Sequence, residues 1–136
     1  MRYSHQREVI KKVVQNTNSH PTADWIFNQT KKIIPNISLG TIYRNLKRLE
    51  EEGEMNTIYD GNIARYDWNT ESHDHLKCKE CGDLVDVHLV HEEFTSKVKR
   101  KFKFDVDNVE MTVISTSSTS NLNFVFTIDL NSLLAK

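Results

Sequence analysis

The sequence contains little of the residues that define several large classes of protein. Its 136 residues include only two prolines, four glycines and two cysteines. Two cysteines in CxxC spacing without an export signal fit a reducing cytoplasm, where such pairs are metal ligands or redox thiols and not structural disulfides. No apolar run reaches the roughly 18 residues of a membrane-spanning helix, so none is expected. The first residues, MRYSHQREVIKKVV, lack an apolar core followed by a cleavage site, so we expect no secretory signal and a cytoplasmic location. With 38% hydrophobic and 27% charged residues, the chain is predicted to be globular, as one domain or two small ones.

Charge is unevenly distributed along the chain, although the formal net charge is only −1. Residues 1–53 carry nine Lys and Arg against five acidic residues, a balance of +4. Residues 54–136 carry nine basic and 14 acidic residues, a balance of −5. A basic first half joined to an acidic, His-rich second half indicates a nucleic-acid module attached to a metal-sensing one.

Three amphipathic helices are predicted in the first half, because apolar residues recur there at spacings of three and four. The first covers Ser4–Gln15. The second covers about Ala23–Ile34, with Thr22 as its N-cap and a proline directly after it. The third begins after a capping serine at position 38 and ends before Gly53, which fits the C′ position of a helix.

A hairpin is predicted after the third helix. Met55–Tyr59 and Ile63–Trp68 are short β-prone runs on either side of Asp60-Gly61-Asn62, a turn signal. Three helices and a hairpin predict a winged helix, whose third helix would enter the major groove of DNA. The alternative is that this helix is simply a solvated amphipathic helix. The candidate DNA contacts on its exposed face are Tyr43 and Arg44 at or near base edges, Lys47 and Arg48 on phosphates, and Thr41 without a more specific role.

Metal-binding side chains gather between Arg65 and His91. This segment holds four of the six histidines and both cysteines of the chain. Imidazole, thiolate and carboxylate are the side chains that bind first-row transition metals. The segment is therefore predicted to form a metal site, and its candidate ligands are Asp67, His73, His75, Cys78, Cys81, Asp86, His88 and His91.

The second half is predicted to be a small α/β unit. Its expected strands are His75–Cys78, Leu84–His88, Val109–Ser115 and Phe124–Ile128, and its expected helix is Glu92–Lys101. A unit this small buries little apolar surface, so we expect it to dimerise. The sequence therefore predicts an α+β fold, with an N-terminal winged helix-turn-helix over residues 1–68 and a small α/β dimerisation domain over residues 69–136.

The chain resembles the ferric uptake regulator (Fur) family over about residues 4–116. The motifs that carry the resemblance are HPTADWIF at 20–27, ISLGTIYRNLKRLEEEG at 37–53, RYDW at 65–68, HDH at 73–75, and CKECG at 78–82 followed by LVDVH. The family consists of dimeric, metal-dependent transcription regulators with an N-terminal winged helix. The resemblance implies a homodimer that binds double-stranded DNA at an inverted-repeat operator, and a protein that is not an enzyme.

Within the family, the resemblance is to the peroxide-sensing (PerR) branch, which binds regulatory iron or manganese with three His and two Asp. An open site of N and O ligands suits Fe(II) or Mn(II), whereas a thiolate would favour zinc. The iron-responsive branch usually has Glu at the two Asp positions, and zinc sensors tend to have Cys at the first. The resemblance also implies that peroxide oxidises His20 or His73 at bound iron and so releases the DNA. The residues that match the ligand motif are His20, Asp67, His73, His75 and Asp86.

The cysteines depart from the family pattern. Most members hold a structural zinc with two CxxC pairs, and the first pair is present here as Cys78 and Cys81. The second pair would fall at Ser117 and Ser120, and a neutral hydroxyl is a poor zinc ligand. The usual four-cysteine site is therefore not expected. The alternatives are reduced thiols without zinc, or a zinc site completed by His88 and His91.

Other functions stay open at this point. In the same class, the chain could be an iron-responsive uptake regulator that does not sense peroxide. It could also be a metallohydrolase, because His and Asp ligands around an open position support hydrolysis, although no further residue stands out as a general base or nucleophile. A zinc-knuckle interaction module is a third class, which the missing second cysteine pair disfavours.

Overall fold

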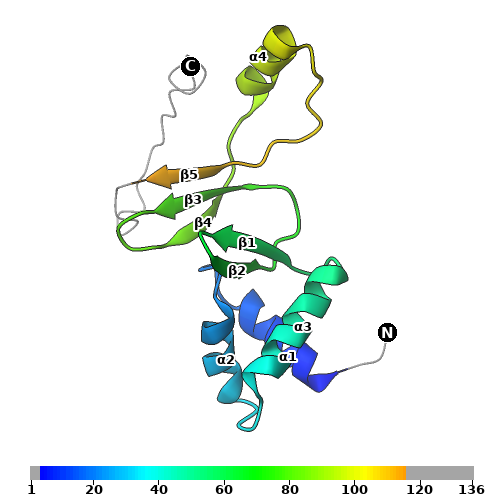
Figure 1. The fold of residues 1–136 in the computed structure, drawn as a ribbon, viewed down its shortest axis with the longest axis vertical. Helices are drawn as coiled ribbons and strands as arrows, with labels where there is room; N and C mark the ends of the chain where they lie inside the picture. Colours follow the sequence, from blue (N-terminus) through cyan, green and yellow to red (C-terminus); the bar gives the residue numbers. More distant parts are fainter. Residues whose placement is uncertain (1–3, 116–136) are drawn as a thin grey trace. The chain divides into compact units, whose positions relative to one another are not determined.

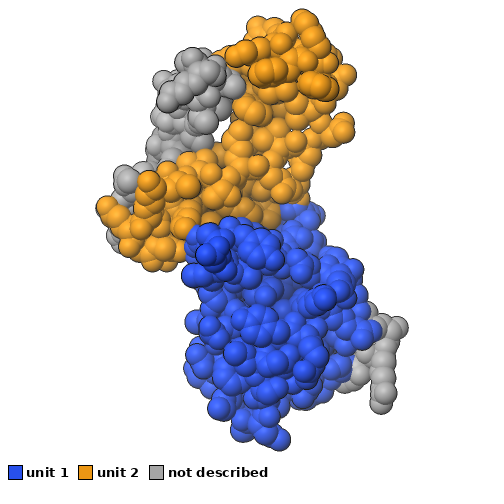
Figure 2. All heavy atoms as spheres, viewed as in Figure 1, with its two compact units in different colours: residues 1–71 blue, residues 72–136 orange. Residues whose placement is uncertain are grey.

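The structure is a computed structural model that describes residues 4–115. The chain divides into two compact units, residues 1–71 and residues 72–136, which Figure 2 shows in different colours. The sequence suggested a boundary after residue 68.

Unit 1 begins with three helices, α1 (His5–Gln15), α2 (Ala23–Lys31) and α3 (Leu39–Glu51) (Figure 1). Each follows a residue whose side chain accepts a hydrogen bond from a backbone N–H of the first turn, which satisfies one of the otherwise unpaired donors there. The three capping residues are Ser4, Thr22 and Ser38, and they accept from Arg7, Trp25 and Thr41.

Helix α2 ends earlier than the expected Ile34. The backbone N–H groups of Ile33 and Ile34 both donate to the carbonyl of Thr30, at 2.9 and 2.8 Å, and the chain leaves the helix in a turn. The physical reason is Pro35, because the residue before a proline is disfavoured in the α conformation.

Helix α3 ends as predicted, at a glycine. Gly53 has a φ of 72° and directly follows the C-cap residue. Its N–H donates to the carbonyl of Glu50 at 3.0 Å, and the N–H of Glu54 donates to Leu49 at 2.9 Å. These two bonds form a Schellman motif, which satisfies carbonyls at the end of the helix.

A hairpin of two strands, β1 (Asn56–Asp60) and β2 (Ile63–Asp67), completes unit 1. Its turn consists of Gly61 and Asn62, and Gly61 has the positive φ, 62°, that the first residue of a type II′ turn requires. The predicted winged-helix arrangement is confirmed. Helices and hairpin share one apolar core, whose members include Ile10, Val14, Ile26, Ile42, Leu46, Leu49, Met55 and Tyr66.

Unit 2 contains β3 (Asp74–Cys78), β4 (Leu84–Val87), α4 (Glu92–Phe102) and β5 (Thr112–Ser115). The strand order is β4-β3-β5, with β3 antiparallel to β4 and parallel to β5. The α+β fold class is thus confirmed, although β5 starts three residues later than expected. The expected strand Phe124–Ile128 lies outside the described residues, as do Ser117 and Ser120.

The described part of unit 2 has few buried apolar residues, namely Leu76, Cys78 and Leu84. Helix α4 has no buried residue. Among residues 4–115, no helix is long and apolar enough to cross a membrane.

Candidate metal centre

His20 lies in the short link between α1 and α2, in an unusual backbone conformation. Its φ is 53°, in the left-handed region that few residues other than glycine adopt. Its side chain is only 4% exposed. A strained, buried histidine persists only where its surroundings hold it in place, and such positions often serve function.

Arg65 of β2 holds this link in unit 1. Its Nε donates to the carbonyl of His20 at 2.7 Å, and its Nη2 donates to the carbonyl of Ser19 at 2.6 Å. The next residue, Tyr66, donates its backbone N–H to the carbonyl of Pro21 at 3.0 Å, and burial raises the pKa of its phenol. The role of Arg65 is not visible in the sequence, because its hydrogen-bond partners lie about 45 positions away in the chain.

The clamped link brings His20 to Asp67, at the end of β2. The distance between Nε2 of His20 and Oδ2 of Asp67 is 3.4 Å, and the carboxylate is 3% exposed. The other carboxylate oxygen of Asp67 accepts the N–H of Asn69 at 2.8 Å, which fixes the orientation of the side chain. Unit 1 therefore presents one imidazole nitrogen and one carboxylate oxygen side by side.

In unit 2, strand geometry brings three further candidate ligands together. Side chains two apart on a strand lie on the same face, so His73, just before β3, and His75 share a face. His75 is paired directly opposite Asp86 of β4. His73 and His75 are two residues apart, and Asp86 lies on the neighbouring strand opposite His75. The three side chains therefore lie next to one another.

The distances between these three side chains suit metal binding. The Nε2 atoms of His73 and His75 are 3.0 Å apart, and Oδ1 of Asp86 lies 3.0 Å and 3.3 Å from them, respectively. Two ligand atoms that each lie about 2.1 Å from one ion, at right angles, are separated by roughly 3 Å. The donor set contains nitrogen and oxygen only, which suits iron or manganese and fits the expected regulatory metal.

Asp74, between the two histidines, faces the other side of the sheet and is 3% exposed. Its Oδ1 accepts the N–H of Met111 at 2.8 Å, and its Oδ2 accepts from the N–H of Leu89 at 3.2 Å and lies 2.8 Å from Nε2 of His91. Burial alone would raise the pKa of Asp74, but the hydrogen bonds from Met111, His91 and Leu89 outweigh it and lower that pKa. Asp74 thus ties β3 to the chain segments before α4 and β5.

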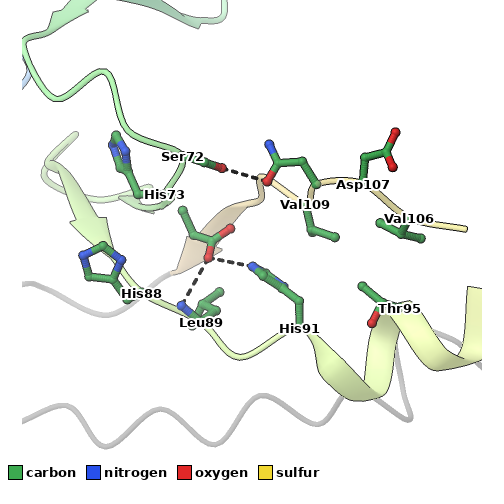
Figure 3. Close-up of a pocket in the computed structure, with 11 residues that line it drawn as sticks. Ser72, His73, His88, Leu89, His91, Thr95, Val106, Asp107 and Val109 are labelled. Carbon is green, nitrogen blue, oxygen red and sulfur yellow. Dashed lines mark hydrogen bonds and ion pairs between the residues drawn. The ribbon is translucent and has the colours of Figure 1, made fainter.

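A pocket of about 330 Å³ opens beside Asp74 in unit 2 (Figure 3). Ser72 contributes to one wall, where its hydroxyl donates to Oδ1 of Asn108 at 2.9 Å. His88, predicted as a candidate ligand, is exposed at the pocket edge, and His91 is held by Asp74. Among the described residues, neither His88 nor His91 belongs to a cluster of side chains that could bind a metal ion.

The two cysteines lie at the turn between β3 and β4. Cys78 is the last residue of β3 and is fully buried, whereas Cys81 is exposed. The backbone N–H of Cys81 donates to Sγ of Cys78 at 3.4 Å. No described His, Asp or Glu side chain forms a three-residue metal group with these two sulfurs.

The candidate DNA-contacting residues lie on α3. Tyr43 is 49% exposed, and Arg44, Lys47 and Arg48 are also exposed. Lys47 and Arg48 each pair with a glutamate one turn later, at 3.9 and 2.9 Å. Thr41 is half-buried, and its hydroxyl accepts from Nη2 of Arg44 at 3.0 Å. The face is basic and accessible, with its long side chains held by weak surface ion pairs.

Comparison with known proteins identifies relatives over most of the chain. The peroxide-responsive repressor PerR of Staphylococcus epidermidis is 34% identical over 115 residues, which span 83% of this chain and 77% of that protein. PerR of Staphylococcus aureus (strain NCTC 8325) is 32% identical over 115 residues, which span 83% of this chain and 78% of that protein.

Solved structures agree with the observed fold. The Campylobacter jejuni peroxide stress regulator aligns with a TM-score of 0.67 at 27% identity, over 85% of this chain and 88% of that one. The Helicobacter pylori ferric uptake regulator Fur aligns with a TM-score of 0.72 at 24% identity, over 88% of this chain and 85% of that one, which supports the fold alone. The model of the ferric uptake regulator family matches residues 1–114. The chain therefore belongs to the ferric uptake regulator family.

Proposed function

We propose that this chain is a peroxide-responsive, metal-dependent transcription repressor that binds DNA as a homodimer. Membership of the family supports the regulatory part, because Fur family proteins are metal-responsive, DNA-binding regulators. The PerR relatives support peroxide as the signal. The family consists of transcription regulators and not of enzymes.

The main observation behind the proposal is which metal-binding side chains each unit brings together. Unit 1 offers His20 and Asp67, and unit 2 offers His73, His75 and Asp86. We propose that both groups bind one Fe(II) or Mn(II) ion. Neither group alone provides the five ligands expected of the regulatory site, and neither includes a thiolate that would favour zinc.

A shared ion would couple metal binding to DNA binding. An ion bound by ligands from both units favours the arrangement of the units in which all five ligands reach it, by its differential affinity for that arrangement. The DNA-contacting helix belongs to unit 1, so fixing that unit relative to unit 2 fixes the spacing of two such helices in a dimer. Loss of the metal would relax that spacing and lower the affinity for the operator.

Peroxide sensing would act through the ligand histidines. Fe(II), when bound, supplies the electrons that reduce peroxide. His20 and His73 are only 4% and 6% exposed. An oxidant formed beside them would therefore react with an imidazole ring before it could diffuse into solvent. Addition of one oxygen atom to either ring removes a basic nitrogen ligand, which weakens metal binding and releases the DNA.

Homodimerisation is assigned to unit 2. Its described residues include large apolar side chains that are more than half exposed, in a unit that has a small core. Exposed apolar surface of this kind commonly marks a protein interface. The residues concerned are Val90, Phe102, Phe104 and Ile114.

The proposal is tested by peptide mass spectrometry after the Fe(II)-loaded protein meets one equivalent of peroxide. Trypsin should release His20 within residues 13–31 and His73 within residues 66–77. We expect a gain of one oxygen atom in either peptide with iron, and none with Mn(II). DNA binding that follows the metal without any histidine oxidation would instead identify an iron-responsive uptake regulator.

A pair of variants separates the ligand set from nearby histidines. His75→Ala removes a proposed ligand, so we expect weaker Mn(II) binding and weaker operator binding. His88→Ala is the matched control, because His88 is exposed and lies two residues beyond Asp86 on the same chain segment. Equal metal affinity in the two variants would contradict the ligand assignment.

The DNA face is tested with Arg44→Ala. If Arg44 reads a guanine, the variant should lose about 1–3 kcal/mol of binding energy and relax specificity at one base pair. A uniform loss across operator variants would make Arg44 a phosphate contact instead. Fluorescence anisotropy with a set of single-base operator variants measures the difference.

A further inference from the structure

The cysteine pair plays no part in the proposed function, and its surroundings do not fit a structural zinc. A structural zinc site takes four protein ligands. The chain has only two cysteines, and beyond residue 115 the only His, Cys, Asp or Glu side chain is Asp129. Within residues 4–115, the structure supplies no third zinc ligand beside the sulfurs of Cys78 and Cys81.

We propose that Cys78 and Cys81 form a redox-active dithiol that peroxide converts to an intrachain disulfide. The geometry of the turn carries the inference. The backbone N–H of Gly82 donates to the carbonyl of Cys78 at 3.0 Å, and the backbone N–H of Cys78 donates to the carbonyl of Asp83 at 2.9 Å. Gly82 has a φ of 77°, which lets the chain turn back at this point.

The turn holds the two cysteines close to each other. Sγ of Cys78 lies 3.4 Å from the backbone nitrogen of Cys81. That nitrogen is three bonds from the Sγ of its own residue, so both sulfurs belong to the same short turn. The thiolate is the form of a cysteine that reacts with peroxide.

The difference in exposure assigns the two sulfurs different roles. Cys81 is exposed and meets a solution oxidant first, whereas Cys78 is fully buried and reacts only with its neighbour. The deprotonated sulfur of Cys81 attacks one peroxide oxygen, the O–O bond breaks, and the departing hydroxide takes up a proton to become water. This step leaves a sulfenic acid on Cys81.

Cys78 then completes the reaction. Its sulfur loses its proton and attacks the Cys81 sulfur, the S–S bond forms, and the S–O bond breaks to release a second water. Two thiols are oxidised by two electrons and one hydrogen peroxide is reduced to two waters. The reaction needs no bound metal, which distinguishes it from histidine oxidation at iron.

The position of Cys78 links the disulfide to the metal strand. Cys78 lies three residues after His75 on β3, and it is paired with Ser115 of β5. The dithiol is therefore a second peroxide-reactive site on the strand that carries the proposed metal ligands.

The test uses the full chain, freed of reductant and loaded with Mn(II), and treated with increasing hydrogen peroxide before the remaining thiols are alkylated. Trypsin cleaves after Lys79, between the two cysteines. We expect the dipeptide Cys78-Lys79 to stay joined to the peptide of residues 80–97 until a reductant is added. Intact mass should show the loss of two hydrogen atoms per chain.

Variants assign the two roles. In Cys78→Ser, the sulfenic acid on Cys81 should persist and react with dimedone, and in Cys81→Ser neither the disulfide nor a dimedone adduct should form. Since Cys78 is fully buried, Cys78→Ala is tested as well, so that misfolding of the serine variant does not decide the result.

Two results would overturn the inference. One is complete alkylation of both thiols in the wild-type chain after peroxide treatment. The other is one tightly bound zinc per chain that protects both thiols and is lost in Cys78→Ala. Histidine oxidation is read on other peptides and requires iron, so failure of the dithiol proposal and failure of the proposed function are seen separately.

Discussion

The two units of the molecule are stabilised in different ways. In unit 1, apolar side chains from three helices and the hairpin form one core, and Ile10, Ile26 and Leu46 are fully buried. In the described part of unit 2, the buried apolar residues are few, and the interior holds the ionised carboxylate of Asp74 with its hydrogen bonds. Hydrophobic burial scales with area, so unit 1 has the means to fold without metal.

The difference suggests a division of labour. A well-packed unit would suit the proposed DNA reading, because side chains that read DNA must be held in fixed positions. A unit with a small core and many hydrogen bonds is closer to marginal stability, and a ligand or a partner chain then stabilises it by mass action. Metal and dimerisation are thus expected to affect unit 2 more than unit 1.

The largest expected effect is on the core of unit 1. Leu46→Ala should lower the free energy of unfolding by about 2–5 kcal/mol, because it removes buried methyl groups and leaves a cavity. The loss should be the same with and without Mn(II), in urea denaturation followed by circular dichroism. Ile33→Ala is the control, since Ile33 is 60% exposed. A loss that Mn(II) reverses would contradict the independence of unit 1.

The next effect concerns the buried carboxylate of unit 2. Asp74→Asn should cost about 1–3 kcal/mol in metal-free protein, because charge-assisted hydrogen bonds are weakened. The pKa of Asp74 is lowered in the folded state, so its stabilisation is complete above the ordinary carboxyl pKa and is lost as the pH falls through the lowered one.

The same variant can be followed against pH. Wild-type unit 2 should lose stability in acid more steeply than Asp74→Asn does, as measured by urea denaturation between neutral and acidic pH. Asp107→Asn is the control, because Asp107 is exposed at the same pocket. Parallel pH profiles for wild type and Asp74→Asn would rule out this role.

A smaller effect is expected from the arginine that holds the His20 link. Arg65→Gln removes its hydrogen bonds to two carbonyls, so His20 is no longer held in its strained conformation. Groups that orient a metal ligand typically contribute tenfold or more to metal affinity, so Mn(II) binding should weaken about tenfold. Arg100→Gln, on α4, controls for net charge. Mn(II) affinity is measured by calorimetry. An unchanged affinity would show that the hydrogen bonds of Arg65 do not position His20 as a metal ligand.

The smallest effect is on the salt dependence of DNA binding. Lys47→Ala should reduce the slope of log affinity against log salt by about 1, if Lys47 contacts one phosphate. Lys32→Ala, at the end of α2, is the control. An unchanged slope would mean that Lys47 stays paired with Glu51 in the complex.

Much of unit 1 could be predicted from the sequence, because its signals are local. Ser38 and Gly53 mark the ends of α3 through hydrogen bonds to residues within one or two turns. The end of α2 was predicted three residues too late, since apolar spacing continues to Ile34 while the effect of the following proline acts earlier.

The candidate site was predictable only in part. Residue type and clustering placed His73, His75 and Asp86 among the candidate ligands, and the family resemblance then selected them. The pairing of His75 opposite Asp86 came from the structure. His20 came from family resemblance, because nothing in its neighbours distinguishes it from any histidine before a proline.

The sequence by itself determined the elements, their order, the residue types available to a metal, and the lack of a second cysteine pair. Only the tertiary structure decided which distant groups meet: Arg65 with the carbonyl of His20, and Asp74 with His91 and Met111. The physical reason is range. Capping, turn chemistry and side-chain periodicity act over a few residues, whereas contacts between residues far apart in the chain depend on how whole elements pack.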